Sequence, residues 1–317
     1  MSTQNGSNMS DQQLVDQYDV EIDVKKLFGI IWADKFRVIA VTIIFVIISI
    51  GYALTVPNQY QATVLLAPAQ QGSGGLAGAG GQLGGLAALA GVSLGGGEAD
   101  ETQIATAIMK SWSFIEAFIE DNDIAVEVFA AKGWDKGKGE LKFEPDWYDT
   151  SKGQWLIKSD KGAELGPPTS WKLYEEFLKK LSISEDKKTG LISVSIEFYS
   201  PEIALSWVEL YVSAINKHMQ ERKIAKVSKN IEYLNAQIKK TSITEMKAVF
   251  YTIIEEQIKS QMLAQASPDY AFASVSPGML PERKSQPHRV LIVAMGAIIG
   301  VILALVLAFG AHFRKTI

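Results

Sequence analysis

The sequence of 317 residues contains no cysteine. Disulfide bonds, cysteine-based zinc sites and a thiol nucleophile are therefore excluded, and the absence is compatible with any cellular compartment. The sequence also lacks an excess of basic residues, because 31 Lys and Arg stand against 35 Asp and Glu. A protein that binds nucleic acid would show a basic patch or stripe. We therefore expect no nucleic-acid partner.

Motifs of catalysis and of cofactor binding are absent as well. The sequence has no Walker A motif, no G-x-S-x-G and no H-E-x-x-H. Its three histidines lie far apart, at positions 218, 288 and 312, so no metal cluster is expected. The paired glutamates at 175–176 and 255–256 fall in predicted helices, where a solvated face explains them. We predict that the protein is not an enzyme and holds no cofactor or metal.

Two long uncharged runs dominate what the sequence does contain. Val38–Val56 has 19 residues and Val290–Gly310 has 21, none of them charged. About 20 apolar residues are needed to span the hydrocarbon core of a membrane. Neither run carries the polar stripe that a helix packed on a soluble core usually shows. We therefore predict transmembrane helices at 38–56 and 290–310.

Basic residues beside the first run set the expected orientation. Four of them precede it, at positions 25, 26, 35 and 37, and none follows before Lys110. The second run has a weaker opposite bias, but the first helix usually dominates. Both termini are therefore expected in the cytoplasm, with residues 57–289 on the other side of the membrane.

The cytoplasmic segments are short in this topology. Residues 1–21 are polar and predict a disordered tail, and residues 311–317 form a second short tail. In residues 22–37, Leu27, Phe28 and Trp32 fall on one helical face with Val24 and Ile31. This pattern indicates either an interfacial helix or an extension of the first span.

The external segment, residues 57–289, mixes strand and helix patterns. Strand spacing covers 60–66, and the clearest alternation is a hairpin of 181–184 and 191–198 around a turn at 186–190. Helical spacing covers 100–121 and 171–180. Segment 71–97 has 12 glycines among 27 residues and predicts a Gly/Ala/Leu-rich loop. The prediction is an α+β domain anchored by two transmembrane helices.

Three tryptophans lie between the strand and helix patterns. Trp134, Trp147 and Trp155 stand near short strand candidates at 141–143 and 155–157. Such side chains could stack on sugar rings, although core or rim positions in a small sheet are more common.

A long helix is predicted at 202–266, because no helix breaker occurs between Pro201 and Pro268. Its part up to Lys240 alone would be roughly 58 Å long at about 1.5 Å per residue, which exceeds the width of a compact domain. A capping box at Ser242–Glu245 predicts a break near Thr241. The helix carries a narrow coiled-coil seam that we expect to pack against a helix of the same or of another subunit. The seam consists of Ile224, Val227, Ile231, Leu234 and Ile238.

Small residues recur every fourth position in the second apolar run. They are Gly296, Gly300, Ala304 and Ala308, and the first two form a GxxxG motif. Small side chains let another helix approach closely within a membrane. We predict that this face packs against a helix.

Five stretches carry a resemblance to a known family. They are Ile22–Phe28, Pro57–Thr63, Ser184–Glu202, Ile231–Gln257 and Tyr270–Pro287. Together they resemble the Wzz-type polysaccharide co-polymerases, the O-antigen chain-length determinants. The resemblance implies an α/β periplasmic base, a long protruding helix and a ring of identical subunits in the bacterial inner membrane.

The same resemblance implies a function. It is non-catalytic control of the modal length of a lipid-linked surface polysaccharide, exerted together with a separate polymerase and the growing glycan. Three alternatives stay open at this point. They are a co-polymerase for capsule or exopolysaccharide export with a separate kinase, a two-span membrane sensor, and an enzyme that acts on the glycan.

The expected topology gives a first testable prediction. A reporter that is active only in the periplasm should be active when fused after Gly190 and silent when fused after Ile317, because the basic bias at the first run keeps both ends in the cytoplasm. Activity at the C-terminal fusion would contradict the two-span arrangement.

Overall fold

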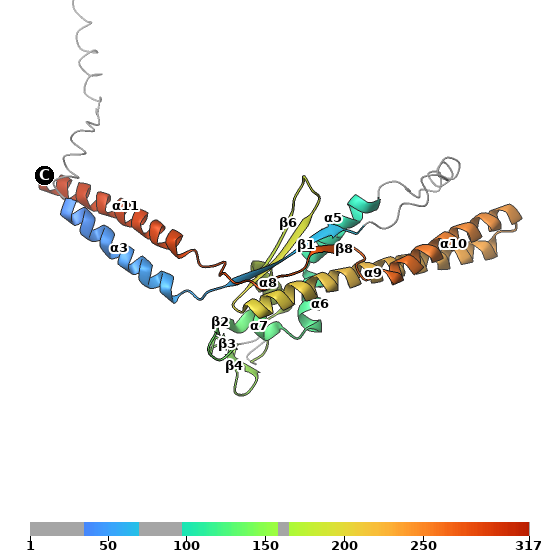
Figure 1. Cartoon of the computed structure of the whole chain (residues 1–317), viewed down its shortest axis with the longest axis horizontal. Helices are drawn as coiled ribbons and strands as arrows, with labels where there is room; N and C mark the ends of the chain where they lie inside the picture. The colour runs from blue at the N-terminus through green and yellow to red at the C-terminus, as the bar shows by residue number, and fades with distance from the viewer. Residues whose placement is uncertain (1–34, 70–96, 158–164, 317) are drawn as a thin grey trace, which may run out of the picture. The chain divides into compact units, whose positions relative to one another are not determined.

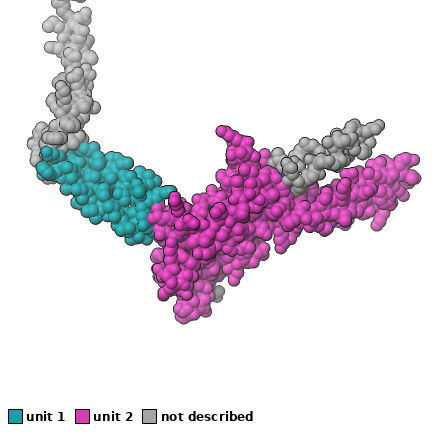
Figure 2. Space-filling model, in the orientation of Figure 1, with its two compact units in different colours: residues 1–56, 288–317 teal, residues 57–287 magenta. Residues whose placement is uncertain are grey.

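The computed structural model describes residues 35–69, 97–157 and 165–316 (Figure 1). These fall into two compact units (Figure 2). We call residues 1–56 with 288–317 the helix-pair unit, and residues 57–287 the sheet unit. The tail predicted at 1–21, most of the segment 22–37 and nearly all of the loop 71–97 lie outside the described residues.

The described part of the helix-pair unit consists of α3 (Lys35–Thr55) and α11 (Arg289–Thr316), which pack against each other. Both helices are long and apolar enough to cross a membrane. Most of their large apolar side chains, such as Ile47 and Ile302, are exposed. That exposure differs from a core helix of a soluble domain and is typical of helices that face lipid.

The sheet unit is built on a four-stranded antiparallel sheet in the order β6-β7-β1-β8. Alternate side chains of a strand point to opposite faces. In β1 the residues Ala62, Val64 and Leu66 are buried, whereas Gln61 and Thr63 are exposed. One face of the sheet is therefore covered and the other is polar. The strands are β1 (Tyr60–Pro68), β6 (Leu181–Glu185), β7 (Ile192–Phe198) and β8 (Phe272–Ser276).

The first half of α9 (Pro201–Lys240) covers the buried face and contacts β1 and β7. Ser200 caps this helix by accepting a hydrogen bond from the Ile203 amide, and Pro201 follows in the first turn, where its missing amide hydrogen costs nothing. Its inward face is continuous with the sheet core. That face is made of Ala204, Trp207, Val208, Tyr211, Ile215 and Met219.

Shorter helices complete the core beside α9. The helices are α5 (Gly97–Met109), α6 (Trp112–Asp121), α7 (Ala125–Ala130) and α8 (Ser170–Lys180). Phe118 of α6 and Phe177 of α8 meet Tyr211 with ring centroids 4.9 and 5.5 Å away. The helix predicted at 100–121 is thus two helices, since Ser111 caps α6 through a bond from the Phe114 amide.

Two small hairpins lie outside the main sheet. They pair β2 (Ala131–Asp135) with β3 (Glu140–Phe143), and β4 (Tyr148–Asp149) with β5 (Gln154–Trp155). Trp155 contacts Tyr148 and Phe129, and Trp147 also contacts Phe129. Both tryptophans therefore belong to a small aromatic cluster.

The long helical segment forms a hairpin. Helix α9 ends at Lys240, and α10 (Thr244–Ala266) returns along it (Figure 1). The Gln220 amide donates to the carbonyl oxygens of Ala264 at 2.8 Å and Ser267 at 3.1 Å, which fixes the antiparallel pairing. The expected capping box is not formed, because α10 begins after Ile243 without a side-chain cap.

These elements confirm the α+β fold class, with a long helix and two apolar helices near the chain ends. At about 1.5 Å per residue, the 40 residues of α9 extend about 60 Å, so its second half reaches beyond the sheet. Among the described residues, the helical hairpin extends beyond the sheet core, and the helix pair forms a unit of its own.

Candidate functional site

The seam predicted on α9 faces the inside of the helical hairpin. Val227 and Ile238 are buried, the former with 2% of its surface exposed. Ile224, Ile231 and Leu234 are half-buried. The structure therefore brings the five seam residues together along α10 of the same chain, and a contact with another subunit stays a prediction.

Most of the large apolar side chains of α10 are exposed. Its inner face is narrow and includes Phe250 and Ile254. Helical spacing alone would place Ile258 and Met262 on the face of Phe250 and Ile254, but both are exposed in the structure. Seven large apolar side chains of α10 are exposed. They are Met246, Val249, Tyr251, Ile253, Ile258, Met262 and Leu263.

The exposed side chains of α10 form two flanks beside its inner face. At about 100° per residue, Met246, Val249 and Ile253 fall on one flank, and Ile258 and Met262 fall on the other with Tyr251. Soluble monomers seldom expose contiguous apolar surface of this kind, and where they do it marks an interaction site. Both sides of the hairpin are therefore candidate contact surfaces.

The small residues of α11 lie against α3. A Cβ atom added at Gly300 would stand 2.9 Å from the Cβ of Phe45 and 3.2 Å from the Cα of Thr42. At Gly296 it would stand 2.5 Å from the Cβ of Ser49. Ala304 and Ala308 are buried. The four residues thus share one close helix–helix contact inside the chain.

A hydrogen bond reinforces this contact. The Ser49 hydroxyl donates to the carbonyl oxygen of Ile292 at 2.8 Å. Glycine backbones bring the two helices near enough for this bond, which satisfies a polar group that lipid would leave unpaired. Packing in a bilayer stays a prediction.

Polar bonds that the sequence did not reveal join the two ends of the sheet unit. The amide of Gln59 donates to the carbonyl of Gln286 at 3.0 Å, and the amide of Ser285 donates to the carbonyl of Gln59 at 2.9 Å. The hydroxyl of Ser285 and the side-chain amide of Gln286 both donate to the carboxylate of Glu197 on β7. The segment that precedes α11 is therefore held to the start of β1.

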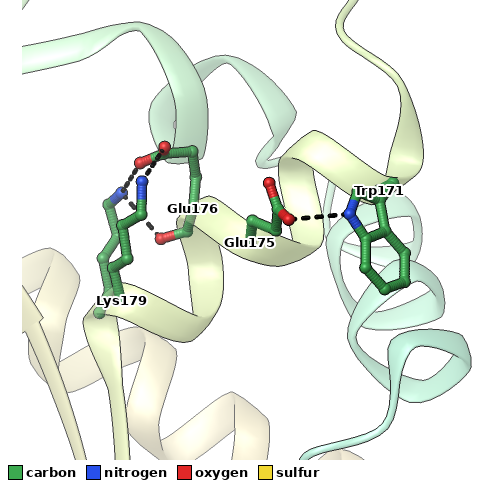
Figure 3. Close-up of polar contacts among 5 residues, drawn as sticks. Trp171, Glu175, Glu176 and Lys179 are labelled. Atoms are coloured by element: carbon green, nitrogen blue, oxygen red, sulfur yellow. Dashed lines mark hydrogen bonds and ion pairs between the residues drawn. The ribbon is translucent and has the colours of Figure 1, made fainter.

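Charged side chains on α8 form a second cluster that the sequence did not single out. The Glu176 carboxylate pairs with the ammonium groups of Lys179 at 2.5 Å and Lys180 at 3.9 Å (Figure 3). Burial lowers the pKa of Lys180 to about 8, although Glu176 acts in the opposite direction. Next to this pair, the indole nitrogen of Trp171 donates to Glu175 at 2.8 Å.

Within the described residues, no group of three or more His, Asp or Glu side chains is placed to hold a metal ion. The described residues instead offer three surfaces on which another molecule could bind. They are the flanks of α10, the outer faces of α3 and α11, and the charged cluster on α8.

A comparison with protein families matches the N-terminal third of the chain. Residues 20–122, about a third of the sequence, match the model of the Wzz family, described as chain length determinant protein. This part of the chain is therefore similar to the Wzz family. The match spans α3, β1, α5 and α6 and contains the first two of the five stretches found in the sequence, Ile22–Phe28 and Pro57–Thr63.

Other comparisons give less. No curated protein matches the sequence. Among solved structures, the chain is similar to a full-length bacterial polysaccharide co-polymerase, with 13% identity, a TM-score of 0.38, and coverage of 91% of this chain and 97% of that one. A fragment of WzzB, a polysaccharide co-polymerase from Salmonella Typhimurium, has 9% identity, a TM-score of 0.27, and coverage of 72% and 99%. TM-scores this low do not establish a shared overall fold.

The helix-pair contact predicts the effect of Gly300→Leu. The added side chain would collide with Phe45, so α3 and α11 should move apart. Because the chain has no native cysteine, spin labels on Tyr52→Cys and Met295→Cys can measure the separation directly. We expect a longer, broader distance distribution and a broadened polysaccharide length distribution.

The matched control is Gly51→Leu in α3, where an added Cβ meets nothing within 4 Å. It should leave the distance unchanged. Equal effects of the two substitutions, or none from Gly300→Leu, would show that the glycine is not needed for the contact.

Proposed function

We propose that this protein sets the modal length of a lipid-linked surface polysaccharide, the O-antigen of lipopolysaccharide. It acts without catalysis, as a homo-oligomer beside a separate polymerase. The observation that carries the proposal is the match of residues 20–122 to the chain length determinant family. The titles of both solved structures also name a polysaccharide co-polymerase.

The proposed location is the bacterial inner membrane. Two apolar helices near the chain ends and the family match both fit an inner-membrane protein. The basic residues before α3 support cytoplasmic termini and a periplasmic sheet unit.

Self-association is the part of the proposal that the hairpin supports. An exposed isoleucine or methionine gains roughly 1.5–3 kcal/mol when it is fully buried, and a symmetric assembly repeats that gain at every contact. Helix α10 presents apolar side chains on both flanks, so one hairpin has a surface for a neighbour on either side. Ile231 and Leu234 of the α9 seam, which are half-buried in one chain, would extend the same contact.

Deletion of the gene tests the function. Electrophoresis of the surface polysaccharide should show loss of the modal length while polymer is still made, because a length regulator supplies no bond-forming step. Total loss of polymer would indicate an enzyme, and an unchanged pattern would favour a sensor. A change in chain length confined to capsule or exopolysaccharide would indicate that the protein regulates that polymer and not the O-antigen.

The hairpin flanks give a separate prediction. Ile258→Asp should reduce the oligomer, measured by mass photometry of the full chain in detergent, and should weaken length control. Since Ile258 is exposed in the single chain, helix content by circular dichroism should not change.

Lys259→Asp is the control for this prediction. Lys259 follows Ile258 in the chain and is also exposed, but it lies outside the apolar flanks. It should leave the oligomer intact. If the two substitutions act alike, the flank of α10 is not a subunit contact.

A further inference from the structure

An exposed tryptophan on α8 is held in a fixed orientation. Trp171 keeps 56% of its surface exposed. Its indole N–H donates to Glu175 (Figure 3). The centroid of its ring lies 5.2 Å from that of Tyr174. The indole N–H therefore already has a hydrogen-bond partner, and more than half of the surface of Trp171 is open to a ligand.

A hydrogen bond links this helix to a turn that a second exposed tryptophan follows. Tyr174 donates its hydroxyl to the carbonyl of Lys110 at 3.2 Å, which joins α8 to the turn before α6. Trp112, two residues further on, is 42% exposed at the start of α6. Helix α8 is thus bonded to the turn that precedes α6 and its exposed tryptophan.

The carboxylates beside Trp171 are not equivalent. Glu176 is engaged by Lys179 and Lys180. Among the described residues, no lysine or arginine forms an ion pair with Glu175, whose Oε1 receives the indole proton. Its Oε2 remains an acceptor for a hydroxyl group, and hydrogen bonds to an ionised acceptor are stronger than neutral ones.

A sugar ring matches this combination. One face of a pyranose presents C–H groups that pack on an aromatic ring, and its rim presents hydroxyl groups that donate to a carboxylate. A bilayer surface fits less well, since Glu175 would repel anionic headgroups. An apolar protein partner would leave the Glu175 carboxylate buried without a partner, which is costly.

We propose that Trp171 and Glu175 form a carbohydrate-binding site for the polysaccharide whose length the protein regulates. The sugar stacks on the indole and donates a hydroxyl hydrogen to Oε2 of Glu175, while Tyr174 positions the indole. The inference rests on the proposed function for the identity of the glycan. One site of this kind binds weakly, but a long glycan can reach sites on several subunits at once, so its retention rises with its length.

Residue-resolved footprinting of the full chain in nanodiscs tests the site. The probe is the surface polysaccharide of the source strain, freed of lipid by mild acid, with dextran at equal mass as the control for radical scavenging. Bound sugar should lower the hydroxyl-radical oxidation of Trp171 saturably, as read by mass spectrometry. Trp147, which is 41% exposed on the small aromatic cluster, should show no such protection.

Two isosteric substitutions separate the roles of the carboxylates. Glu175→Gln keeps an oxygen for the indole bond and removes the charge, so half-protection of Trp171 should require at least threefold more polysaccharide. Glu176→Gln makes the same change one residue away and should leave the half-protection concentration unchanged. Trp171→Ala should weaken retention of the full-length polysaccharide by at least tenfold.

Failure of the site and failure of the proposed function give different results. Absence of saturable protection at Trp171, protection of Trp147 to the same degree, or equal effects of the two glutamine substitutions would overturn the site. If the site binds but gene deletion leaves the length distribution unchanged, the site stands as a glycan site and length regulation fails.

Discussion

The pairing of β1 with two distant strands is the constraint on which the rest of the sheet unit depends. Tyr60 lies opposite Phe198, and Leu66 lies opposite Ile192, so the apolar sets of β1 and β7 fall on the same face. On its other edge β1 pairs with β8, from more than 200 residues later in the chain. A slip of one residue would turn every buried side chain of β1 outward.

Helix α9 depends on that face and also departs from it. Its first half contributes Trp207 and Tyr211 to the core, whereas its second half packs along the narrow inner face of α10. The buried side chain of Asn216 ties α9 to β8. Its amide group donates to the carbonyl of Phe272, and its carbonyl oxygen accepts from the Phe272 amide. The core thereby fixes the base of a hairpin whose outer flanks remain available for association.

Much of the fold follows from local patterns in the sequence. The hairpin of β6 and β7 shows strict alternation and a turn in which Gly190 adopts a φ of +69°, as glycine allows. Strand β8 escaped prediction because its place is set by the edge of β1, and only Phe272 along it is fully buried. The sequence did not single out Trp171 either, since the orientation of its exposed side chain depends on contacts with both Glu175 and Tyr174.

The sequence by itself determined the two apolar helices, the α+β class and the start of α9, because each depends on neighbours along the chain. An uncharged run of about 20 residues is long enough to span a membrane whatever surrounds it. Only the tertiary structure decided which helix covers the seam of α9 and which helix meets Gly296 and Gly300. A spacing of three and four residues fits a partner from the same chain or from another copy equally well, and the choice between them is made by the turn after Lys240 and the packing it permits.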